Sequence, residues 1–383
     1  MRIIVAPDSF KGSVSALGVA EAMERGIHAV FPEAEVLKVP IADGGEGTVE
    51  ALVAATHGHL KHAEVRGPLG TPVRAHWGVS GDGDTAFIEM ASASGLPLVA
   101  KDQRDPRITS TFGTGELMKA ALDAGLRKLV VGIGGSATND GGTGMARALG
   151  VTFLDAQGQD LPEGGAALAN LARIDLTGLD PRLKEAAILV ACDVDNPLCG
   201  PRGASAVYGP QKGATPEMVT ELDAALAVFA RHAATATGRD VALAPGAGAA
   251  GGLGAGLLFF TPAVLRPGVG IVLETTGFEQ QVQKADLVIT GEGRTDFQTA
   301  MGKAPVGVAD VAKHYGVPVI CLSGGLGEGA DDVLTHGIDA LASTVPQPMA
   351  LEACMAQGAQ LVEAATARVC RLLKVGMFIQ SFQ

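Results

Sequence analysis

The chain of 383 residues contains 53 glycines, about 14% of the total and roughly twice the usual share. The glycines follow no G-X-Y period, which excludes collagen, and an apolar fraction of 47% is too high for a disordered chain. Aromatic residues are too few to stack along single-stranded nucleic acid, and a net charge of −12 repels a phosphate backbone. The composition indicates a globular protein with glycine in tight loops and, at this length, two domains.

The cysteines and the apolar stretches indicate the cellular location of the protein. Five cysteines without a CxxC pair predict reduced thiols, no zinc site and a cytoplasmic location. The apolar N-terminal run stops too early for a signal peptide. Between Asp240 and Arg266 lie 25 uncharged residues, enough to cross a bilayer. Because the first half of this stretch is mainly glycine and alanine, we interpret it as a loop leading into a buried helix and expect no membrane partner.

Short β-branched runs separated by helical patterns predict a doubly wound, parallel α/β sheet. The runs expected to form strands are Ile3–Ala6, Val36–Pro40, Leu129–Ile133, Ile188–Cys192, Leu287–Thr290, Val317–Leu322 and Ile338–Ala342. The patterns expected to form helices are Ser15–Val30 with Ser13 or Ser15 as its cap, Glu116–Ala124, Pro216–Ala234, Ala304–His314 and Met349–Leu373.

Residues 59–90 show a different pattern, which predicts a second architecture within the chain. The runs His62–Arg66, Val73–Val79 and Thr85–Met90 alternate over short distances and are separated by turn residues, as in an antiparallel meander. A plain βαβ rhythm returns near residue 285. We therefore expect a discontinuous domain of residues 1–65 and 285–375, an inserted α/β domain of residues 66–284 with some antiparallel strands, and a tail of residues 376–383.

Six of the expected strands run directly into polar, glycine-rich loops. In open α/β sheets ligands bind beyond the carboxyl ends of the strands, so six such loops favour an active site over ordinary turns. Glycine-rich loops point backbone N–H groups at anions, and Lys11, Lys212 and Lys303 lie near glycines where they can neutralise phosphate. Asp193 and Asp195 suit Mg²⁺ or a proton-accepting role. These are the components of phosphoryl transfer, so a kinase without a P-loop is the favoured function.

Other motifs are weaker or missing. The segment Gly246–Gly251 matches the dinucleotide fingerprint, but Pro245 precedes it and no strong strand does. An NAD-linked hydroxyacid oxidoreductase therefore stays as an alternative, as does a ligand-binding regulator without catalytic activity. The motifs GxxxxGK[ST], HExxH and GxSxG are absent. We interpret His57, His59 and His62 as solvated loop histidines rather than as metal ligands.

Seven segments, spread in order over nearly the whole chain, closely resemble the type 1 glycerate kinase family. They are PDSFKGSVSA (7–16), ADGGEGT (42–48), GIGGSATNDGGTGM (132–145), ACDVDNPLCGPRGAS (191–205), GPQKGATPEM (209–218), PGAGAAGGLGAG (245–256) and TGEGRTDFQTAMGKAP (290–305). The chain departs from the usual pattern at Gly12, at Phe297 and in the tail from Val375 onward.

The resemblance implies a cytoplasmic enzyme that uses ATP and Mg²⁺ to phosphorylate D-glycerate. Most members of the bacterial group are taken to give 2-phosphoglycerate, and 3-phosphoglycerate stays open as the product. It also implies a Rossmann-like α/β domain built from both chain ends, an inserted α/β domain, and an active site in the cleft between them. Domain closure over this cleft is a further hypothesis, because glycine loops at the crossover points would permit it. D-glycerate and ATP are the expected partners, nucleic acid is not, and a homodimer is left open.

The residue chemistry and the resemblance together assign the roles in the expected site. Asp193 is the first choice for general base and Asp296 the second, while Lys11 and Lys303 offset phosphate charge. Asp193 and Asp195 are the expected Mg²⁺ ligands, and Arg294 is expected to bind the glycerate carboxylate. The remaining substrate-binding candidates are Asp8, Ser9, Asp43 and Gln298. The nucleotide-binding candidates are Gly134, Gly135, Ser136, Thr138, Asn139, Gly251, Gly252 and Gly254.

Overall fold

The computed structural model describes residues 1–41, 44–45 and 47–380, and the chain forms two compact units. Unit 1 comprises Met1–Asp43, Glu50–Thr56 and Val269–Gln383, and unit 2 comprises Gly44–Val49 and His57–Gly268. Each unit has its own sheet, one fully parallel and one mixed, so the predicted α/β class is confirmed. Two helices, α2 (Thr48–Ala55) and α9 (Gly268–Thr275), begin in the residues of unit 2 and continue in those of unit 1.

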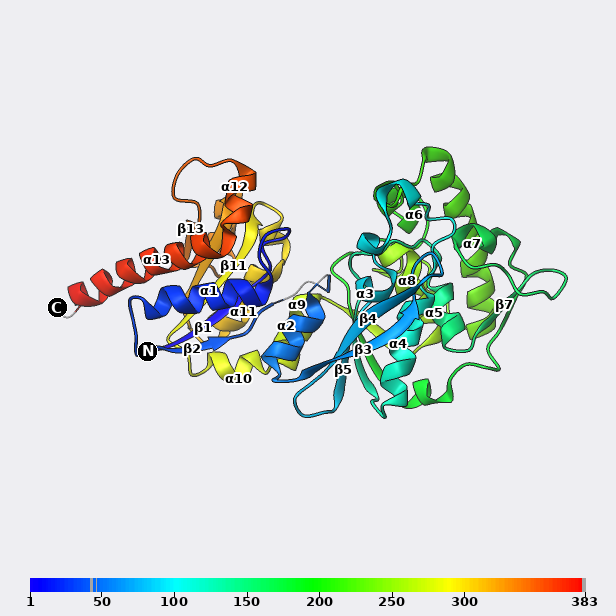
Figure 1. Ribbon diagram of the computed structural model, residues 1–383, viewed down its shortest axis with the longest axis horizontal. Coiled ribbons are helices and arrows are strands. Elements are labelled where there is room, and N and C mark those ends of the chain that lie inside the picture. Colours follow the sequence, from blue (N-terminus) through cyan, green and yellow to red (C-terminus); the bar gives the residue numbers. More distant parts are fainter. Residues whose placement is uncertain (42–43, 46, 381–383) are drawn as a thin grey trace. The chain divides into compact units, whose positions relative to one another are not determined.

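Unit 1 is built on five parallel strands in the order β13-β12-β11-β1-β2 (Figure 1). Along the sheet, the chain moves from β1 to β2 toward one edge and from β11 to β12 toward the opposite edge. Because such crossovers are right-handed, α1 and α11 cover opposite faces of the sheet. The strands are β1 (Arg2–Pro7), β2 (Glu35–Lys38), β11 (Leu287–Thr295), β12 (Val319–Leu326) and β13 (Ala340–Ser343). The remaining helices are α1 (Ala16–His28), α10 (Phe278–Val282), α11 (Ala304–His314), α12 (Leu351–Ala356) and α13 (Gly358–Gln380), with 3₁₀ turns η6 (Thr299–Met301) and η7 (Ala330–Thr335).

One face of this sheet is covered by α1 and α13, which pack against each other. The periodicity of α1 buries Val19, Met23 and Ile27 against the inward side chains of β1 and β11. The Ser15 hydroxyl accepts the Gly18 N–H at 3.2 Å and caps α1, as the second of the two expected caps.

Unit 2 contains a six-stranded sheet in the order β10-β9-β6-β5-β4-β3, in which β4 runs antiparallel to both of its neighbours and the other pairs are parallel. The predicted meander is therefore confirmed. The strands are β3 (His59–Arg66), β4 (Pro72–Val79), β5 (Thr85–Glu89), β6 (Lys128–Gly132), β9 (Ala187–Ala191) and β10 (Ala263–Arg266), with a separate hairpin of β7 (Thr152–Leu154) and β8 (Arg173–Asp175). The helices are α3 (Ala91–Ser94), α4 (Phe112–Asp123), α5 (Thr143–Ala148), α6 (Ala204–Tyr208), α7 (Pro216–Thr237) and α8 (Ala249–Phe260), with 3₁₀ turns η1 (Leu96–Leu98), η2 (Lys101–Gln103), η3 (Gly165–Asn170), η4 (Pro181–Glu185) and η5 (Pro210–Lys212).

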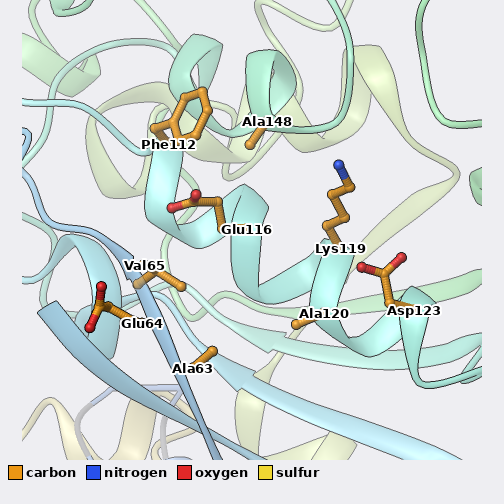
Figure 2. A pocket seen from close by; sticks show the side chains of 9 residues that line it. All are labelled: Ala63, Glu64, Val65, Phe112, Glu116, Lys119, Ala120, Asp123 and Ala148. Carbon is orange, nitrogen blue, oxygen red and sulfur yellow. The ribbon is translucent and has the colours of Figure 1, made fainter. Parts of the chain in front are cut away.

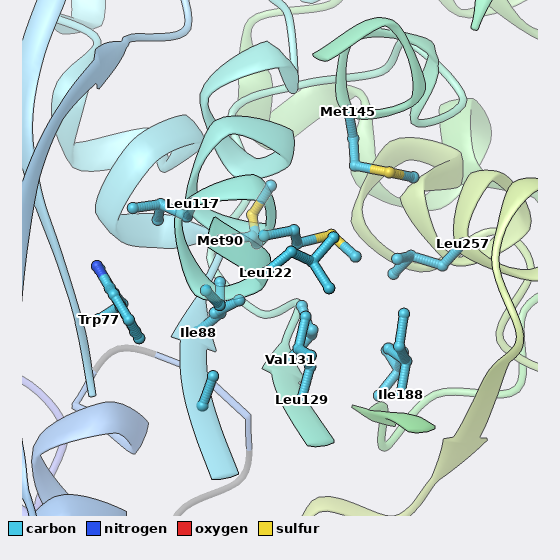
Figure 3. Packing of buried hydrophobic residues seen from close by; sticks show 14 of the residues in the cluster. Trp77, Ile88, Met90, Leu117, Leu122, Leu129, Val131, Met145, Ile188 and Leu257 are labelled. Atoms are coloured by element: carbon cyan, nitrogen blue, oxygen red, sulfur yellow. The ribbon is translucent and has the colours of Figure 1, made fainter. Parts of the chain in front are cut away.

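Two apolar clusters stabilise unit 2. The first joins the sheet to α4 and α8, and Figure 3 shows Leu122, Val131 and Leu257 within it. The second lies among α7, α8 and the β7–β8 hairpin, where Phe153, Phe229, Phe259 and Phe260 meet. The Phe229 and Phe259 rings are 5.7 Å apart and nearly perpendicular, which is a favourable edge-to-face arrangement.

Several details differ from the sequence-based expectation. β11 and β12 continue beyond Thr290 and Leu322, so Glu292–Thr295 is strand rather than loop. The glycines allow this pairing, since a Cβ on Gly291 would lie 2.0 Å from a carbonyl oxygen of β12. His59 and His62 are exposed on β3 and not in a loop.

The long C-terminal helix expected over Met349–Leu373 is two helices, with a break at Gln357. The Met355 carbonyl accepts the Ser13 hydroxyl at 2.6 Å instead of continuing the helical ladder. Gly358 sits so close to Ser13 that a Cβ there would lie 2.3 Å from its hydroxyl oxygen. The tertiary contact with Ser13 therefore accompanies the end of α12.

The apolar stretch before Arg266 forms a turn followed by α8, whose residues are mostly buried. This confirms the interpretation as a loop leading into a buried helix. Across the described ranges, no helix combines the length and the apolar character needed to cross a membrane. All five cysteines are free thiols, as predicted.

The aromatic cluster gives a stability prediction for unit 2. Phe229 is fully buried, so Phe229→Ala should remove about 3–5 kcal/mol of unfolding free energy through lost contacts and a residual cavity. Leu243→Ala, at a residue 85% exposed in the same unit, is the matched control and should change stability by under about 0.5 kcal/mol. Urea unfolding followed by circular dichroism measures both, and equal effects would contradict the assigned core.

Candidate functional site

In unit 1 the carboxyl ends of β1 and β11 lie side by side where the two crossovers diverge. The Asp8 N–H donates to the Gly291 carbonyl at 2.8 Å. A Cβ on Gly293 would come within 3.5 Å of the Lys11 backbone nitrogen, so the segment Asp8–Lys11 lies against β11. A topological switch point of this kind is where open α/β sheets bind ligands. The structure therefore brings Asp8, Ser9 and Lys11 next to the end of β11.

Asp296 gathers three other predicted residues of unit 1 around one carboxylate. Its Oδ1 accepts the Gln298 N–H at 3.0 Å and lies 3.8 Å from the Lys303 Nζ. Its Oδ2 lies 3.7 Å from the Arg294 Nε. Arg294 has a 71% exposed side chain and Lys303 a 42% exposed one. Such long, exposed ion pairs are weak, so both cations are available to an incoming anion.

The buried carboxyl group of Glu292 lies next to this cluster and was not among the predicted site residues. Its Oε1 accepts the Thr299 hydroxyl at 2.6 Å and the Thr295 hydroxyl at 3.2 Å. Thr295 also hydrogen-bonds the Ser323 hydroxyl at 2.6 Å. Burial raises the pKa of Glu292 above its usual range, although the Thr299 hydrogen bond and the Lys303 charge oppose this shift. The sequence signal was only Gly-Glu-Gly after a strand, which does not reveal burial.

In unit 2 the loop after β6 holds five of the predicted nucleotide-binding residues. Gly135 is exposed with φ +75°, whereas Ser136, Thr138 and Asn139 are buried. The Asn139 amide donates to the Ser205 hydroxyl at 2.9 Å. The N–H groups of Gly135 and Ser136 find no acceptor among the described residues. Gly135, the exposed residue of the loop, is therefore the part suited to an anion.

Asp140 lies at the start of α5 and binds its first N–H groups. Its carboxylate accepts N–H groups from Thr111 at 2.8 Å, Gly142 at 3.0 Å and Gly144 at 3.1 Å, and the Thr111 hydroxyl at 2.8 Å. Burial raises the pKa of Asp140, while these four donors oppose the shift. An external phosphate is therefore not expected at the start of α5, because a side chain of the loop itself binds these N–H groups.

Lys212 lies on the buried side of the same loop. Its Nζ donates to the Ser136 Oγ and to the Thr138 carbonyl, both at 2.6 Å, and the residue is 1% exposed. Burial lowers the pKa of Lys212 to about 7, while the charge of Asp140 opposes the shift. The run Gly-Pro-Gln-Lys-Gly marked this lysine as a phosphate-neutralising candidate, but its burial was not predicted.

Gly251, Gly252 and Gly254 are buried against backbone rather than exposed. A Cβ on Gly251 would lie 1.9 Å from the Thr138 carbonyl oxygen, and one on Gly254 would lie 2.1 Å from the Gly246 carbonyl oxygen. Gly251 and Gly252 also have positive φ values, which interrupt the regular geometry of α8. No strand directly precedes Gly246, so the structural context of a dinucleotide fingerprint is missing. These glycines provide close packing, and nucleotide contact by them stays a prediction.

Asp193 and Asp195 follow β9 and are both exposed. The Asp193 Oδ1 accepts the Gly268 N–H at 2.8 Å, at the start of α9. Both oxygens of Asp195 lie 2.9–3.0 Å from one nitrogen of Arg202. Mg²⁺ usually binds one or two carboxylates together with substrate phosphates and water, and the Mg²⁺ site at Asp193 and Asp195 stays a prediction. The predicted Asp43 lies outside the described residues.

A pocket on unit 2, shown in Figure 2, lies between β3 and α4 and is separate from these groups. Glu64, Glu116, Lys119 and Asp123 contribute its charged side chains. None of the predicted site residues lines it. Its net acidic lining does not suit a phosphate.

Comparison with known proteins covers nearly the whole chain. The family model described as "Glycerate kinase family" matches residues 3–374. A glycerate kinase of Bacillus subtilis strain 168 is 55% identical over 98% of both chains, and a glycerate 2-kinase of Escherichia coli K12 is 50% identical over 98% of this chain and 99% of its own. A crystal structure from Salmonella typhimurium LT2, described as a glycerate kinase 2, has a TM-score of 0.88 and 52% identity, covering 98% of this chain and 99% of its own.

The raised pKa of Glu292 predicts how stability depends on pH. Between the unfolded pKa of about 4.3 and the higher folded value, the folded state keeps a proton that the unfolded state loses. Unfolding free energy should therefore decrease as the pH rises through this window. Glu292→Gln, which still offers an acceptor oxygen, should lack this decrease and gain stability relative to the unmodified chain as the pH rises.

Urea unfolding between pH 4 and 8 measures this difference. Glu352→Gln, at an exposed position of the same unit, is the matched control and should show no such trend. A stability difference between Glu292→Gln and the unmodified chain that stays constant over pH would contradict the prediction.

Proposed function

The chain belongs to the glycerate kinase family, and we propose that it transfers the γ-phosphoryl group of ATP to the 2-hydroxyl of D-glycerate. The products would be 2-phospho-D-glycerate and ADP. The observation that carries the choice of hydroxyl is the 50% identity, over 98% of the chain, to a protein named glycerate 2-kinase. Transfer to the 3-hydroxyl is the alternative, because other relatives are named only as glycerate kinases.

Phosphate binding is assigned to the loop after β6 in unit 2. The N–H group of Gly135, the exposed residue of this loop, is a donor of the kind that binds phosphate oxygens. Lys11 and Lys303 of unit 1 would add positive charge to the γ-phosphate as it leaves ADP. Phosphoryl transfer depends mainly on such positioning and charge stabilisation, so no covalent role of the protein is needed.

Glycerate binding is assigned to the end of β11. The exposed Arg294 guanidinium is a planar fork that can hold the glycerate carboxylate with two hydrogen bonds. Asp8, Ser9 and Gln298, on neighbouring segments of unit 1, would then contact the hydroxyl groups. Asp43 is also proposed to contact the substrate.

Asp193 is proposed as the general base and Asp296 as the second candidate. The base would take the proton of the attacking hydroxyl while the oxygen–phosphorus bond forms and the bond between the γ-phosphorus and the bridging oxygen breaks. Asp193 and Asp195 would hold Mg²⁺, which when bound supplies charge neutralisation on the phosphates. The exposed ion pair between Asp195 and Arg202 would open at little cost.

The reaction is tested by incubating the protein with ATP, Mg²⁺ and D-glycerate and recording ³¹P NMR spectra. The expected spectrum gains the resonances of ADP and of 2-phosphoglycerate. A 3-phosphoglycerate resonance would show transfer to the 3-hydroxyl and contradict the proposed 2-hydroxyl, and unchanged ATP would refute the kinase activity. Addition of NAD in place of ATP, with nicotinamide absorbance as readout, tests the oxidoreductase alternative.

Asp193→Asn should lower kcat by about 10²–10⁴-fold, because the amide cannot accept the hydroxyl proton. The Asn side chain keeps an oxygen for the Gly268 N–H, so a fold change is not the expected cause. Asp102→Asn, at an exposed position of the same unit, is the matched control and should keep normal turnover. Near-normal kcat in Asp193→Asn together with a large loss in Asp296→Asn would move the base to Asp296.

A further inference from the structure

Lys212 is a buried cation that contacts the loop after β6 from its buried side. It ends the short turn η5, and the chain then reverses at Gly213 with φ +97°. A Cβ on Gly213 would lie 2.4 Å from the Arg104 carbonyl oxygen, so only glycine fits this close contact. The lysine side chain is thereby directed to Ser136 and Thr138 and is shielded from solvent.

The loop above Lys212 contains polar atoms that the protein itself leaves without partners. Thr138 Oγ1 and Asn139 Oδ1 are fully buried and have no hydrogen-bond partner among the described residues. A buried polar group without a partner costs free energy, so this loop conformation is not stabilised by its own side chains alone. The two Lys212 hydrogen bonds, at 2.6 Å each, are the strong charged contacts that hold it.

We propose that Lys212 is a positioning residue for the phosphates of ATP. It holds the Ser136 hydroxyl and the Thr138 carbonyl from the buried side, and it thereby fixes the conformation of the loop whose residue Gly135 is exposed. Its positive charge, in a poorly solvated place, also favours an anion on that side. The inference rests on the proposed function, in which this loop binds the phosphates.

The charges around Lys212 make the effect depend on pH. Asp140, on the same loop, is the charged group that opposes the lowering of the Lys212 pKa, and Arg104 packs against the adjacent Gly213. With a pKa of about 7, the lysine loses its proton within the physiological range. A neutral amine still donates hydrogen bonds but no longer attracts phosphate. ATP affinity should therefore fall as the pH rises through 7.

Isothermal titration of the full chain with MgATP, between pH 6 and pH 9 and without glycerate, tests this. The unmodified chain should lose about tenfold in affinity across the range, as expected when one charge interaction disappears. Lys212→Met should bind more than about tenfold more weakly at pH 6 and should lack this pH step, and it should stay weaker than the unmodified chain at pH 9, where the neutral amine still donates its hydrogen bonds. The titration of ATP itself is common to both proteins, so the difference between them reports Lys212.

Ser136→Ala is the second variant and keeps the test valid if Lys212→Met does not fold. It removes one acceptor of the ammonium group, so the pH midpoint of the affinity step should move to lower pH. In steady-state assays Lys212→Met should raise KM for ATP more than it lowers kcat. The same pH dependence in the unmodified chain and Lys212→Met, or an unmoved midpoint in Ser136→Ala, would overturn the inference.

These measurements also separate this inference from the proposed function. Binding is measured without turnover, so a chain that binds ATP with the expected pH step but phosphorylates no glycerate refutes only the proposed reaction. Normal turnover without the pH step refutes only the role of Lys212. A rise in KM for D-glycerate alone in Lys212→Met would contradict both the role of Lys212 and the assignment of the loop to ATP.

Discussion

The organisation of unit 2 depends on carboxylates that bind the first N–H groups of helices. Glu89, at the end of β5, accepts N–H groups at the start of α2, with the Thr48 nitrogen at 3.1 Å. Asp140 does the same for α5 and for the residue before α4, and Asp193 for the first residue of α9. A negative charge is favourable at a helix N-terminus because of the unpaired N–H groups and the helix dipole. The end of β5, the loop after β6 and the segment after β9 are thus tied directly to the helices around them.

This constraint determines where an external anion can bind. In unit 2 the start of α5 is occupied by Asp140, so the exposed Gly135 of the loop after β6 is the part of this segment suited to an external anion. In unit 1 the start of α11 is different, because it follows Lys303 and has no side-chain cap. The positive charge of the Lys303 side chain and the positive end of the α11 dipole lie at the same place, which suits an anion such as a phosphate group. The two units therefore offer complementary kinds of anion site.

The sequence predicted most strands of both sheets, because their apolar runs are a local signal, but it missed β10, which lies in the stretch interpreted as a loop and a buried helix. It also predicted that polar residues gather at strand ends. It did not predict that β11 continues to Thr295, because glycine normally signals a turn, whereas here its missing side chain allows close strand pairing. The sequence also did not predict which charged residues are buried. Glu292 and Lys212 look like surface charges in the sequence, and only packing by residues distant in the chain shields them from solvent.

The glycine excess has two physical origins that composition alone cannot separate. Exposed glycines such as Gly135 leave a backbone N–H open to a ligand. Buried ones such as Gly251 instead let two backbones touch, and a Cβ there would lie 1.9 Å from the Thr138 carbonyl oxygen. That same carbonyl accepts a hydrogen bond from Lys212. A glycine of α8 and a lysine of η5 therefore fix one peptide group from two directions. The conformation of the loop after β6 is consequently determined by contacts on its buried side, and no ligand on its exposed side is needed for them.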